Sequence, residues 1–162
     1  LLIATGYLPY AFSENLCNAK LVYALQENGW EVDVISRVDE GNTYSTEWQE
    51  PWLCLQPNIN EVTYPAGNKI SRILDLLRST IQMGGYPLNG IRWARRAYQK
   101  AVVLHKEKHY DVILTRSPND IPHIIGYKLK KRFGIRWIAN WNDPSATIWP
   151  EPYTHHFSSL KK

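Results

Sequence analysis

The sequence predicts an α/β protein with a doubly wound, Rossmann-like parallel sheet in three α/β/α layers. Strand-like and helical segments alternate along most of the chain, as they do in proteins built from βαβ units. The strand-like segments are largely apolar, which is typical of strands that helices cover on both faces. The chain has 162 residues, 44% of them hydrophobic, which suffices for the core of a single domain. We expect the strand order 3-2-1-4-5.

The first three elements form a strand–helix–strand unit. Residues 1–5 (LLIAT) are a short apolar run that indicates a buried parallel strand. Ser13 is expected to cap the next helix and Gly29 to end it in a left-handed conformation, before a second strand at 30–36 (WEVDVIS). An apolar stripe on the helix is predicted at Cys17, Leu21, Ala24 and Leu25. We therefore expect Cys17 to be a buried, reduced thiol.

The middle of the chain predicts one edge strand and one helix. Residues 37–57 are polar and aromatic without a clean period, so we expect a long loop or an insertion. Residues 61–65 (EVTYP) predict an edge strand that Pro65 ends. An amphipathic helix is expected over 70–81, and the GGYPLNG segment at 84–90 breaks it. Its apolar stripe consists of Ile70, Ile73, Leu74, Leu77 and Ile81.

The last third of the chain has the clearest pattern. A long helix is expected from Ile91, then a strand at 110–116 (YDVILTR), a helix from Ile121 that ends at Gly134, and a strand at 135–141 (IRWIANW). The inward face of the first of these helices is predicted at Ile91, Ala94, Tyr98, Ala101, Val102 and His105. Its outer face consists of Arg92, Arg95, Arg96, Gln99 and Lys100.

Positive charge is concentrated in this part of the chain. The net charge of the whole sequence is +4 at pH 7, whereas residues 92–136 hold twelve Lys and Arg against three acids. Such a surface could meet anionic lipid, nucleic acid or a phosphorylated ligand, and the alternative is that these are ordinary solvated helix faces. No aromatic–basic repeat or known nucleic-acid motif accompanies the charge, so we expect no nucleic-acid partner.

The residues that follow each predicted strand are candidate site residues. Ligands of open parallel sheets bind beyond the carboxyl ends of the strands, and here those positions are polar or small. They are Thr5, Gly6 and Tyr7 after the first strand, Ser36 and Arg37 after the second, Arg116, Ser117, Pro118 and Asn119 after 110–116, and Asn140, Trp141, Asn142 and Asp143 after 135–141.

The turn after the first strand lacks the signature of a dinucleotide site. In a G-x-G-x-x-G turn the glycines let the backbone approach a pyrophosphate, but Gly6 is followed by bulky residues such as Leu8 and Phe12. Glu14 in the first helical turn would also repel a diphosphate. The P-loop pattern is absent too. We therefore do not expect NAD or FAD at this turn.

The same turn suits a sugar or a polyol. Glu14 can accept hydrogen bonds from hydroxyls, and the N–H groups of the helix N-terminus point into the cleft. Tyr7, Tyr10 and Phe12 offer flat faces for a ligand ring. The alternative is purely structural: Glu14 favours the helix dipole, and Phe12 serves as a hydrophobic staple.

Two segments resemble the N-terminal domain of GT-B-fold glycosyltransferases, in the large retaining group classed as family four. Residues 5–36 (TGYLPYAFSENLCNAKLVYALQENGWEVDVIS) are similar to the opening strand, turn and helix of the family, with Trp30 in place of the usual His. Residues 110–144 (YDVILTRSPNDIPHIIGYKLKKRFGIRWIANWNDP) are similar to a later strand, small-residue turn, helix and strand that runs into Asp-Pro. The resemblance covers most of the chain, with little over 37–60 and 145–162.

The resemblance implies a function for the whole protein. Such enzymes move a sugar from a nucleotide-sugar donor to a glycan or lipid-linked acceptor, with retention and without a metal or other cofactor. Their N-terminal domain chiefly holds the acceptor, and its first turn approaches the phosphate and sugar of the donor, which maps here onto Gly6 and residues 12–15. A second domain with an E-x7-E motif holds the donor nucleotide. Residues 1–162 are therefore expected to be one acceptor-side domain without that second domain, and to be inactive alone.

On this resemblance, Glu14 and Asp143 are the expected catalytic residues. Many relatives place a sugar-contacting His after the fifth strand, where this chain has Asn142, Asp143 and Pro144. Pro144 favours extended backbone at Asp143, whose carboxylate could bind sugar hydroxyls or stabilise positive charge at the anomeric carbon, although Asp-Pro is equally a common turn. The family's Gly-Gly pair is replaced by Ser13 and Glu14. The expected substrate-binding residues are Gly6, Tyr7, Phe12, Ser13, Asn15, Arg116, Ser117, Asn119 and Asn142.

The resemblance also suggests a location. Family members with lipid-linked acceptors dock on anionic headgroups, and here Arg92, Arg95, Arg96 and Lys100 could do so. The sequence shows no signal peptide and no apolar run of membrane-spanning length, so we expect a cytoplasmic protein, peripheral to the inner face of the membrane. No metal site is expected, because His123, His155 and His156 lack partners at ligand spacing. The alternative functions are a non-catalytic Rossmann-like module that binds a nucleotide or other ligand, and a structural piece whose basic face binds a partner.

Overall fold

The computed structural model of the chain describes residues 1–8, 12–39, 58–64, 68–82, 91–116 and 121–141. Within these ranges the strands are β1 (Leu2–Ile3), β2 (Asp33–Asp39), β3 (Asn58–Tyr64), β4 (Val112–Arg116) and β5 (Arg136–Asn140). The helices are α1 (Ser13–Glu27), α2 (Lys69–Gln82), α3 (Ile91–Lys108) and α4 (Ile121–Phe133).

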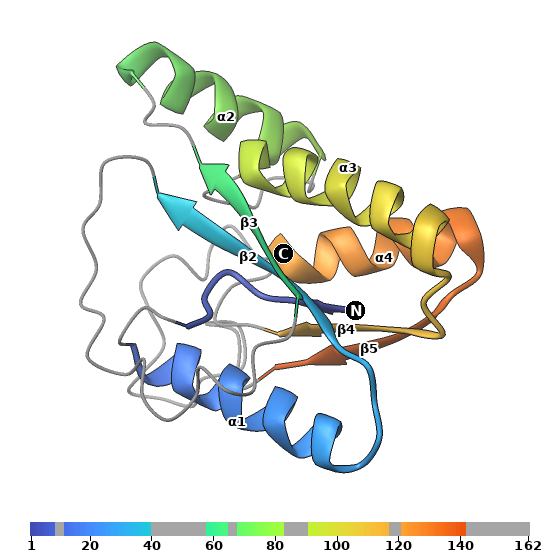
Figure 1. Ribbon diagram of the computed structural model, residues 1–162. Coiled ribbons are helices and arrows are strands. Elements are labelled where there is room, and N and C mark those ends of the chain that lie inside the picture. The colour runs from blue at the N-terminus through green and yellow to red at the C-terminus, as the bar shows by residue number, and fades with distance from the viewer. Residues whose placement is uncertain (9–11, 40–57, 65–67, 83–90, 117–120, 142–162) are drawn as a thin grey trace, which may run out of the picture.

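These strands form one parallel sheet in the order β3-β2-β1-β4-β5, which confirms the predicted order. Helices α3 and α4 cover one face of the sheet and α1 covers the other, while α2 lies outside, against α3 (Figure 1). The domain is thus a Rossmann-like α/β/α fold, as the alternation of elements predicted. The strand order reverses next to β1, because the chain adds β2 and β3 on one side of it and β4 and β5 on the other.

Each face of the sheet has its own apolar core. Neighbouring residues of a strand point to opposite faces, so Leu2 and Ile3 of β1 belong to different cores. Ile3 packs with the strands and with α3 and α4, whereas Leu2 packs on the α1 side. The α1-side core consists of Leu2, Tyr7, Leu8, Ala19, Val22 and Val34.

Two glycines end helices as predicted. Gly29 has a φ of +80°. Its N–H donates to the Gln26 carbonyl at 2.9 Å, and the Trp30 N–H donates to the Leu25 carbonyl at 3.1 Å, which is the hydrogen-bond pair of a Schellman motif. Gly134, with a φ of +71°, ends α4. Glycine fits both positions because it adopts a left-handed backbone conformation at no steric cost.

The bounds of the second strand differ from the prediction. β2 begins at Asp33 rather than at Trp30, because the capping turn of α1 occupies residues 28–30. It continues past Ser36 to Asp39, since it pairs with β3 along its whole length. β3 lies at the edge of the sheet, as predicted.

The inward face of α1 is not the predicted one. Cys17 is exposed, so the expectation of a buried thiol was wrong. The predicted stripe counted only apolar residues, whereas a polar contact orients this helix: Asn18 donates from Nδ2 to the Gly6 carbonyl at 2.8 Å. The buried residues of α1 are Asn15, Asn18, Ala19 and Val22.

The inward face of α3 was predicted in part. Ala94 and Ala101 are buried as expected, but Trp93, Ala97 and Leu104 are buried as well. The Trp93 ring is fully buried, and its Nε1–H donates to the Val62 carbonyl of β3 at 3.0 Å. This hydrogen bond satisfies the one polar atom of the ring, so the residue can lie in the core.

α2 forms where the periodicity predicted a helix, but its orientation is unusual. The five residues of its apolar stripe are between 47% and 81% exposed. Asp75, on the other side of the helix, is buried. This is the opposite of the arrangement expected for a surface helix, whose apolar side normally faces the core.

Candidate functional site

The candidate site surrounds the turn that follows β1. Ile3 pairs with Ile35 of β2 on one side and with Thr115 of β4 on the other. The next residues, Ser36 and Arg116, therefore flank the end of β1 at the same level. Because side chains alternate along a strand, both point to the α1 face of the sheet.

Gly6 lets the first turn and α1 approach closely. A Cβ atom at position 6 would lie 1.9 Å from Asn15 Oδ1, so no larger residue fits without a shift of Asn15. The Gly6 carbonyl accepts the hydrogen bond from Asn18 Nδ2. The two buried asparagines of α1 thus fix the turn against the helix, and Gly6 has a structural role in the site.

Glu14 and Arg116 meet at this turn. Arg116 Nη2 lies 3.7 Å from Glu14 Oε1, an ion pair between the first turn of α1 and the end of β4. The Glu14 side chain is 21% exposed and the Arg116 side chain is 11% exposed. Two predicted site residues that are far apart in the sequence therefore form one charged pair at the edge of the sheet, shielded from much of the solvent.

Three buried polar atoms near this pair have no hydrogen-bond partner among the described residues. They are Asn18 Oδ1, Ser36 Oγ and Arg116 Nε. Buried polar groups are normally satisfied, so such atoms indicate a place for water or for a polar ligand. They come from α1, β2 and β4, the three elements that meet at the end of β1.

The structure places two predicted site residues, Phe12 and Ser13, at the N-terminus of α1 and a third, Tyr7, in the core. Phe12 is the N-cap residue of α1: its carbonyl accepts the Leu16 N–H at 3.1 Å, and its ring is exposed. Ser13 is not the cap, because the helix begins at Ser13 itself. Tyr7 lies in the α1-side core, where burial raises the pKa of its hydroxyl, so its ring does not offer a face to a ligand.

Several other predicted site residues lie either outside the described residues or within β2. Asp143, Ser117, Asn119 and Asn142 lie outside the described residues, as does Tyr10. Ser36 and Arg37 were expected just beyond the second strand but lie within β2, because that strand extends to Asp39. Arg37 stacks on Tyr64 of β3, with its guanidinium carbon 4.2 Å from the ring centroid.

Sequence analysis missed Asn18 as a site residue. Its position four residues after Glu14 places both on one side of the helix, which was the available signal. The apolar stripe was the stronger pattern and favoured a different side. The burial of the Asn18 side chain against the turn after β1 was therefore not predicted.

A second polar cluster, on the opposite face of the sheet, has a structural role. Thr115 Oγ1 lies 2.8 Å from His123 Nδ1 and accepts a hydrogen bond from Trp137 Nε1 at 2.8 Å. The His123 ring packs against Trp141, with 4.1 Å between centroids. The cluster joins β4, α4 and β5, and it explains why this histidine is buried.

An open cavity of about 470 Å³ lies at the other edge of the sheet, near the amino ends of the strands. It is lined on the α1 side by Leu25 and Trp30, and its wall includes Ile138 of β5. Ligands of this fold typically bind at the carboxyl ends of the strands, so the Glu14–Arg116 edge is the candidate site in preference to this cavity.

Neither a metal cluster nor a membrane span is found among the described residues. No group of three or more His, Cys, Asp or Glu there could hold a metal ion. None of the helices in these ranges has both the length and the apolar content that crossing a bilayer requires. The longest of them, α3, carries cationic residues over most of its length.

No protein-family model and no curated protein matches the sequence. Among solved structures, the chain is similar to sucrose-phosphate synthase from Thermosynechococcus elongatus, with a TM-score of 0.51 and 17% identity, covering 88% of this chain and 33% of that one. The likeness establishes the fold. A predicted subunit of a tRNA methyltransferase from Methanocaldococcus jannaschii matches with a TM-score of 0.35 and 11% identity, covering 86% and 67% of the two chains. That score is too low to indicate a common fold.

The comparison supports the fold that the family resemblance implies. The chain spans a third of the length of sucrose-phosphate synthase, a GT-B glycosyltransferase, and shares the α/β architecture of that part. The protein therefore has a Rossmann-like α/β fold similar to that part of sucrose-phosphate synthase.

Proposed function

We propose that this chain is the N-terminal, acceptor-side domain of a glycosyltransferase. The proposed enzyme moves a sugar from a nucleotide-sugar to a glycan or lipid-linked acceptor, with retention and without a metal. The glycosyltransferase-like fold supports this proposal. The single observation that carries it is the Glu14–Arg116 pair at the carboxyl edge of the sheet, next to three buried polar atoms without partners among the described residues.

The pair suits a ligand that is rich in hydroxyls. The Glu14 carboxylate accepts hydrogen bonds from hydroxyl groups, and the Arg116 guanidinium donates hydrogen bonds to hydroxyl or phosphate oxygens. Sugar hydroxyls could also satisfy Asn18 Oδ1 and Ser36 Oγ, because a hydroxyl both donates and accepts. Phe12, exposed at the N-terminus of α1, offers an aromatic face beside them.

Arg116 also changes the expectation for the donor phosphate. Glu14 alone would repel a diphosphate at the N-terminus of α1, but the guanidinium beside it offsets part of that repulsion. The N–H groups of the first helical turn favour an anion as well. The donor phosphate is therefore proposed to approach this turn while its nucleotide is held by a second domain outside these residues.

In this proposal Glu14 and Asp143 act at the anomeric carbon. Positive charge develops there as the sugar leaves the donor, and a fixed carboxylate stabilises that charge in a site with little water. Ser117, Asn119 and Asn142 are proposed to contribute further hydroxyl contacts, with Asn15 and Gly6 fixing the turn. Because the donor nucleotide is proposed to bind elsewhere, residues 1–162 alone should be inactive.

The test is a conservative change of Glu14 in the complete protein. Glu14→Gln keeps the size and removes the charge, so kcat/KM for sugar transfer should fall about 100-fold or more, measured at a temperature where circular dichroism shows the variant to be folded. Glu27→Gln, in the exposed last turn of the same helix, is the matched control and should transfer at the wild-type rate. Wild-type turnover by Glu14→Gln would remove Glu14 from the proposed site.

A non-catalytic binding module is the second candidate function. The three buried polar atoms would be satisfied equally by a ligand that is bound and not turned over. Calorimetry and product analysis on the complete protein separate the two functions. Binding of a nucleotide-sugar without release of the nucleotide would favour the binding module.

The basic surface of α3 is proposed to contact anionic headgroups at the inner face of a membrane. Two of its four cations also have partners within the domain: Arg92 pairs with Asp75, and Arg96 Nη1 donates to the Thr63 carbonyl at 3.2 Å. Arg95 and Lys100 are exposed. These two are therefore the residues to change in a test of the headgroup contact.

A further inference from the structure

The apolar stripe of α2 is the largest departure from ordinary packing in the described structure. Ile70, Ile73, Leu74, Leu77 and Ile81 lie at helical spacing on one side of the helix. Each is exposed, from 47% for Leu74 to 81% for Ile81. Single exposed apolar residues are common on proteins, but a continuous aliphatic stripe of this kind marks an interaction surface.

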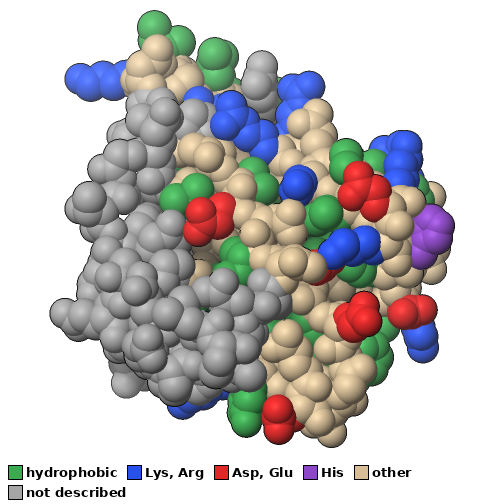
Figure 2. All heavy atoms as spheres, viewed as in Figure 1, with side chains coloured by type: hydrophobic (Ala, Val, Ile, Leu, Met, Phe, Trp, Pro, Cys, Tyr) green, Lys and Arg blue, Asp and Glu red, His purple; other side chains and the backbone are tan. Residues whose placement is uncertain are grey.

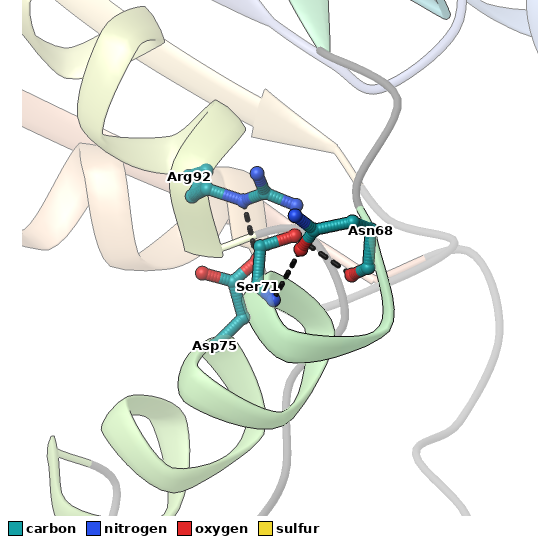
Figure 3. Close-up of polar contacts among 4 residues, drawn as sticks. All are labelled: Asn68, Ser71, Asp75 and Arg92. Atoms are coloured by element: carbon teal, nitrogen blue, oxygen red, sulfur yellow. Dashed lines mark hydrogen bonds and ion pairs between the residues drawn. The ribbon is translucent and has the colours of Figure 1, made fainter.

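The polar side of α2 contacts the rest of the domain through α3. Asp75 is buried and accepts a hydrogen bond from Arg92 Nε of α3 at 2.5 Å (Figure 3). At the start of the helix, the Ser71 N–H donates to Asn68 Oδ1 at 2.8 Å, and Ser71 Oγ donates to the Asn68 carbonyl at 2.9 Å (Figure 3). The Asn68 cap and the Arg92–Asp75 ion pair hold the polar side of α2 toward the domain. The aliphatic side is therefore exposed and available to bind another surface.

The sequence of α2 carries a net positive charge. The sequence of α2 contains Lys69, Arg72 and Arg78 and a single acid, Asp75, which is already paired with α3. Arg95 of the neighbouring α3 is exposed. Figure 2 shows Lys and Arg side chains beside hydrophobic ones at the top of the molecule, where Figure 1 places α2.

This charge decides between two possible occupants of the stripe. A second copy of the chain would bring the same cations together across a two-fold axis, and like charges in close contact are unfavourable. An anionic bilayer attracts the cations and also offers an apolar layer to the aliphatic side chains. A helix of 14 residues is too short to span a bilayer but long enough to lie in its surface.

We propose that α2 is a membrane-surface helix. The stripe inserts at the boundary between headgroups and acyl chains of an anionic bilayer, and the cations of α2 and α3 contact the headgroups. The inference extends the proposed headgroup contact of α3 and names the element that inserts. It does not depend on sugar transfer, because lipid binding is measured without any sugar.

The experiment is co-sedimentation of the complete protein with phosphatidylcholine vesicles, with and without phosphatidylserine. The wild type should pellet with the anionic vesicles. Leu74→Ser/Leu77→Ser, at the centre of the stripe, should lower the partition coefficient at least about tenfold. Val103→Ser on α3 is the matched control, because Val103 is 49% exposed and lies off the stripe. It should bind as the wild type does.

Salt dependence separates insertion from headgroup contact. Arg95→Glu/Lys100→Glu should weaken binding mainly at low ionic strength, since it removes the screened electrostatic part. The Leu74→Ser/Leu77→Ser variant should remain weak at every salt concentration. Equal melting temperatures for all variants show that the fold is intact.

Three results would overturn the inference. The first is a wild-type protein that does not pellet with anionic vesicles. The second is a Leu74→Ser/Leu77→Ser variant that pellets as well as the wild type. The third is a wild-type dimer in sedimentation velocity that the variant converts to a monomer without a change in vesicle binding, which would assign the stripe to self-association. None of these outcomes bears on whether the protein transfers sugar.

Discussion

At the scale of single residues, the polar contacts at the β1–α1 turn explain both its shape and its proposed chemistry. Gly6 lies where a side chain would overlap Asn15, and the Asn18 side chain donates a hydrogen bond to the Gly6 carbonyl. These contacts fix the first turn of α1, so Glu14 meets Arg116 at the edge of the sheet.

Gly6→Ala tests this close approach. The new methyl group would meet Asn15 Oδ1 at 1.9 Å, so the free energy of unfolding should fall by about 1–3 kcal/mol in urea denaturation. In an Asn15→Ala background the space is open, and the same change should cost clearly less. An equal cost in both backgrounds would show that Asn15 is not what excludes a side chain at position 6.

Asp33 provides a second test, at the opposite edge of the sheet. Its buried carboxylate accepts hydrogen bonds from Lys108 Nζ, at 2.7 Å, and from the Tyr110 hydroxyl. Burial alone would raise the pKa of Asp33, but the hydrogen bonds from Lys108, Tyr110 and Asn58 more than offset this and leave the pKa below its usual value. In turn, burial and the nearby Asp33 carboxylate raise the pKa of Tyr110.

The stability of the fold should therefore depend on pH through Asp33. A pKa that is lower in the folded state stabilises the protein above the unfolded value of about 3.9, and this stabilisation is lost as the pH falls through the folded pKa. Asp33→Asn should cost about 1–3 kcal/mol of unfolding free energy at pH 7, and less as the pH approaches about 2. Asp111→Asn is the control at an exposed position. A cost for Asp33→Asn that does not vary with pH would contradict the shifted pKa.

At the scale of elements, the orientation of each helix follows from its polar contacts as much as from its apolar residues. α1 turns its asparagines toward the sheet, and α2 turns Asp75 toward Arg92. α3 packs closely through Ala97 and Ala101 and buries Trp93. In all three helices a polar or small residue decides which side is inward.

Two substitutions in α1 test its orientation. Val22 is buried on the α1 side of the sheet, so Val22→Ala should cost about 2 kcal/mol of unfolding free energy. Cys17 is exposed, so Cys17→Ala should change stability by less than about 0.5 kcal/mol. Urea denaturation of both variants measures the difference. A larger cost at Cys17 than at Val22 would favour the apolar stripe that the sequence predicted.

The elements and their order could be predicted from the sequence, and the helix faces could not. Apolar runs and the rules for parallel connections suffice for the strand order, and Gly29 and Gly134 end their helices as expected. The orientation of α2 depends on Arg92, which belongs to the following helix, α3, and periodicity within one helix carries no information about such a partner. The same holds for Asn18, whose partner is a backbone carbonyl.

Part of the site was also predictable. The rule that ligands bind at the carboxyl edge of a parallel sheet indicated Gly6, Glu14 and Arg116, and these residues do gather there. Tyr7 was misassigned, because an aromatic residue in a turn can equally serve the core, as it does here. The start of α1 was misplaced by one residue, since Phe12 supplies the first carbonyl through its backbone.

At the scale of the whole molecule, the proposed functions lie at one edge of the sheet. α2 begins shortly after β3, at the carboxyl ends of the strands but on the α3 side of the sheet, whereas the Glu14–Arg116 pair lies on the α1 side (Figure 1). The chain covers a third of sucrose-phosphate synthase, and in this proposal a separate domain binds the donor nucleotide.

The central claim is that the complete protein transfers a sugar from a nucleotide-sugar at the Glu14–Arg116 edge. The most direct measurement is incubation of the complete protein with a panel of nucleotide-sugars and acceptor glycans, with NMR detection of the released nucleotide and of the anomeric configuration of the product. We predict that one donor is consumed with retention of configuration, and that Glu14→Gln abolishes this reaction. A complete protein that consumes no donor, or a Glu14→Gln variant that transfers as fast as the wild type, would contradict it.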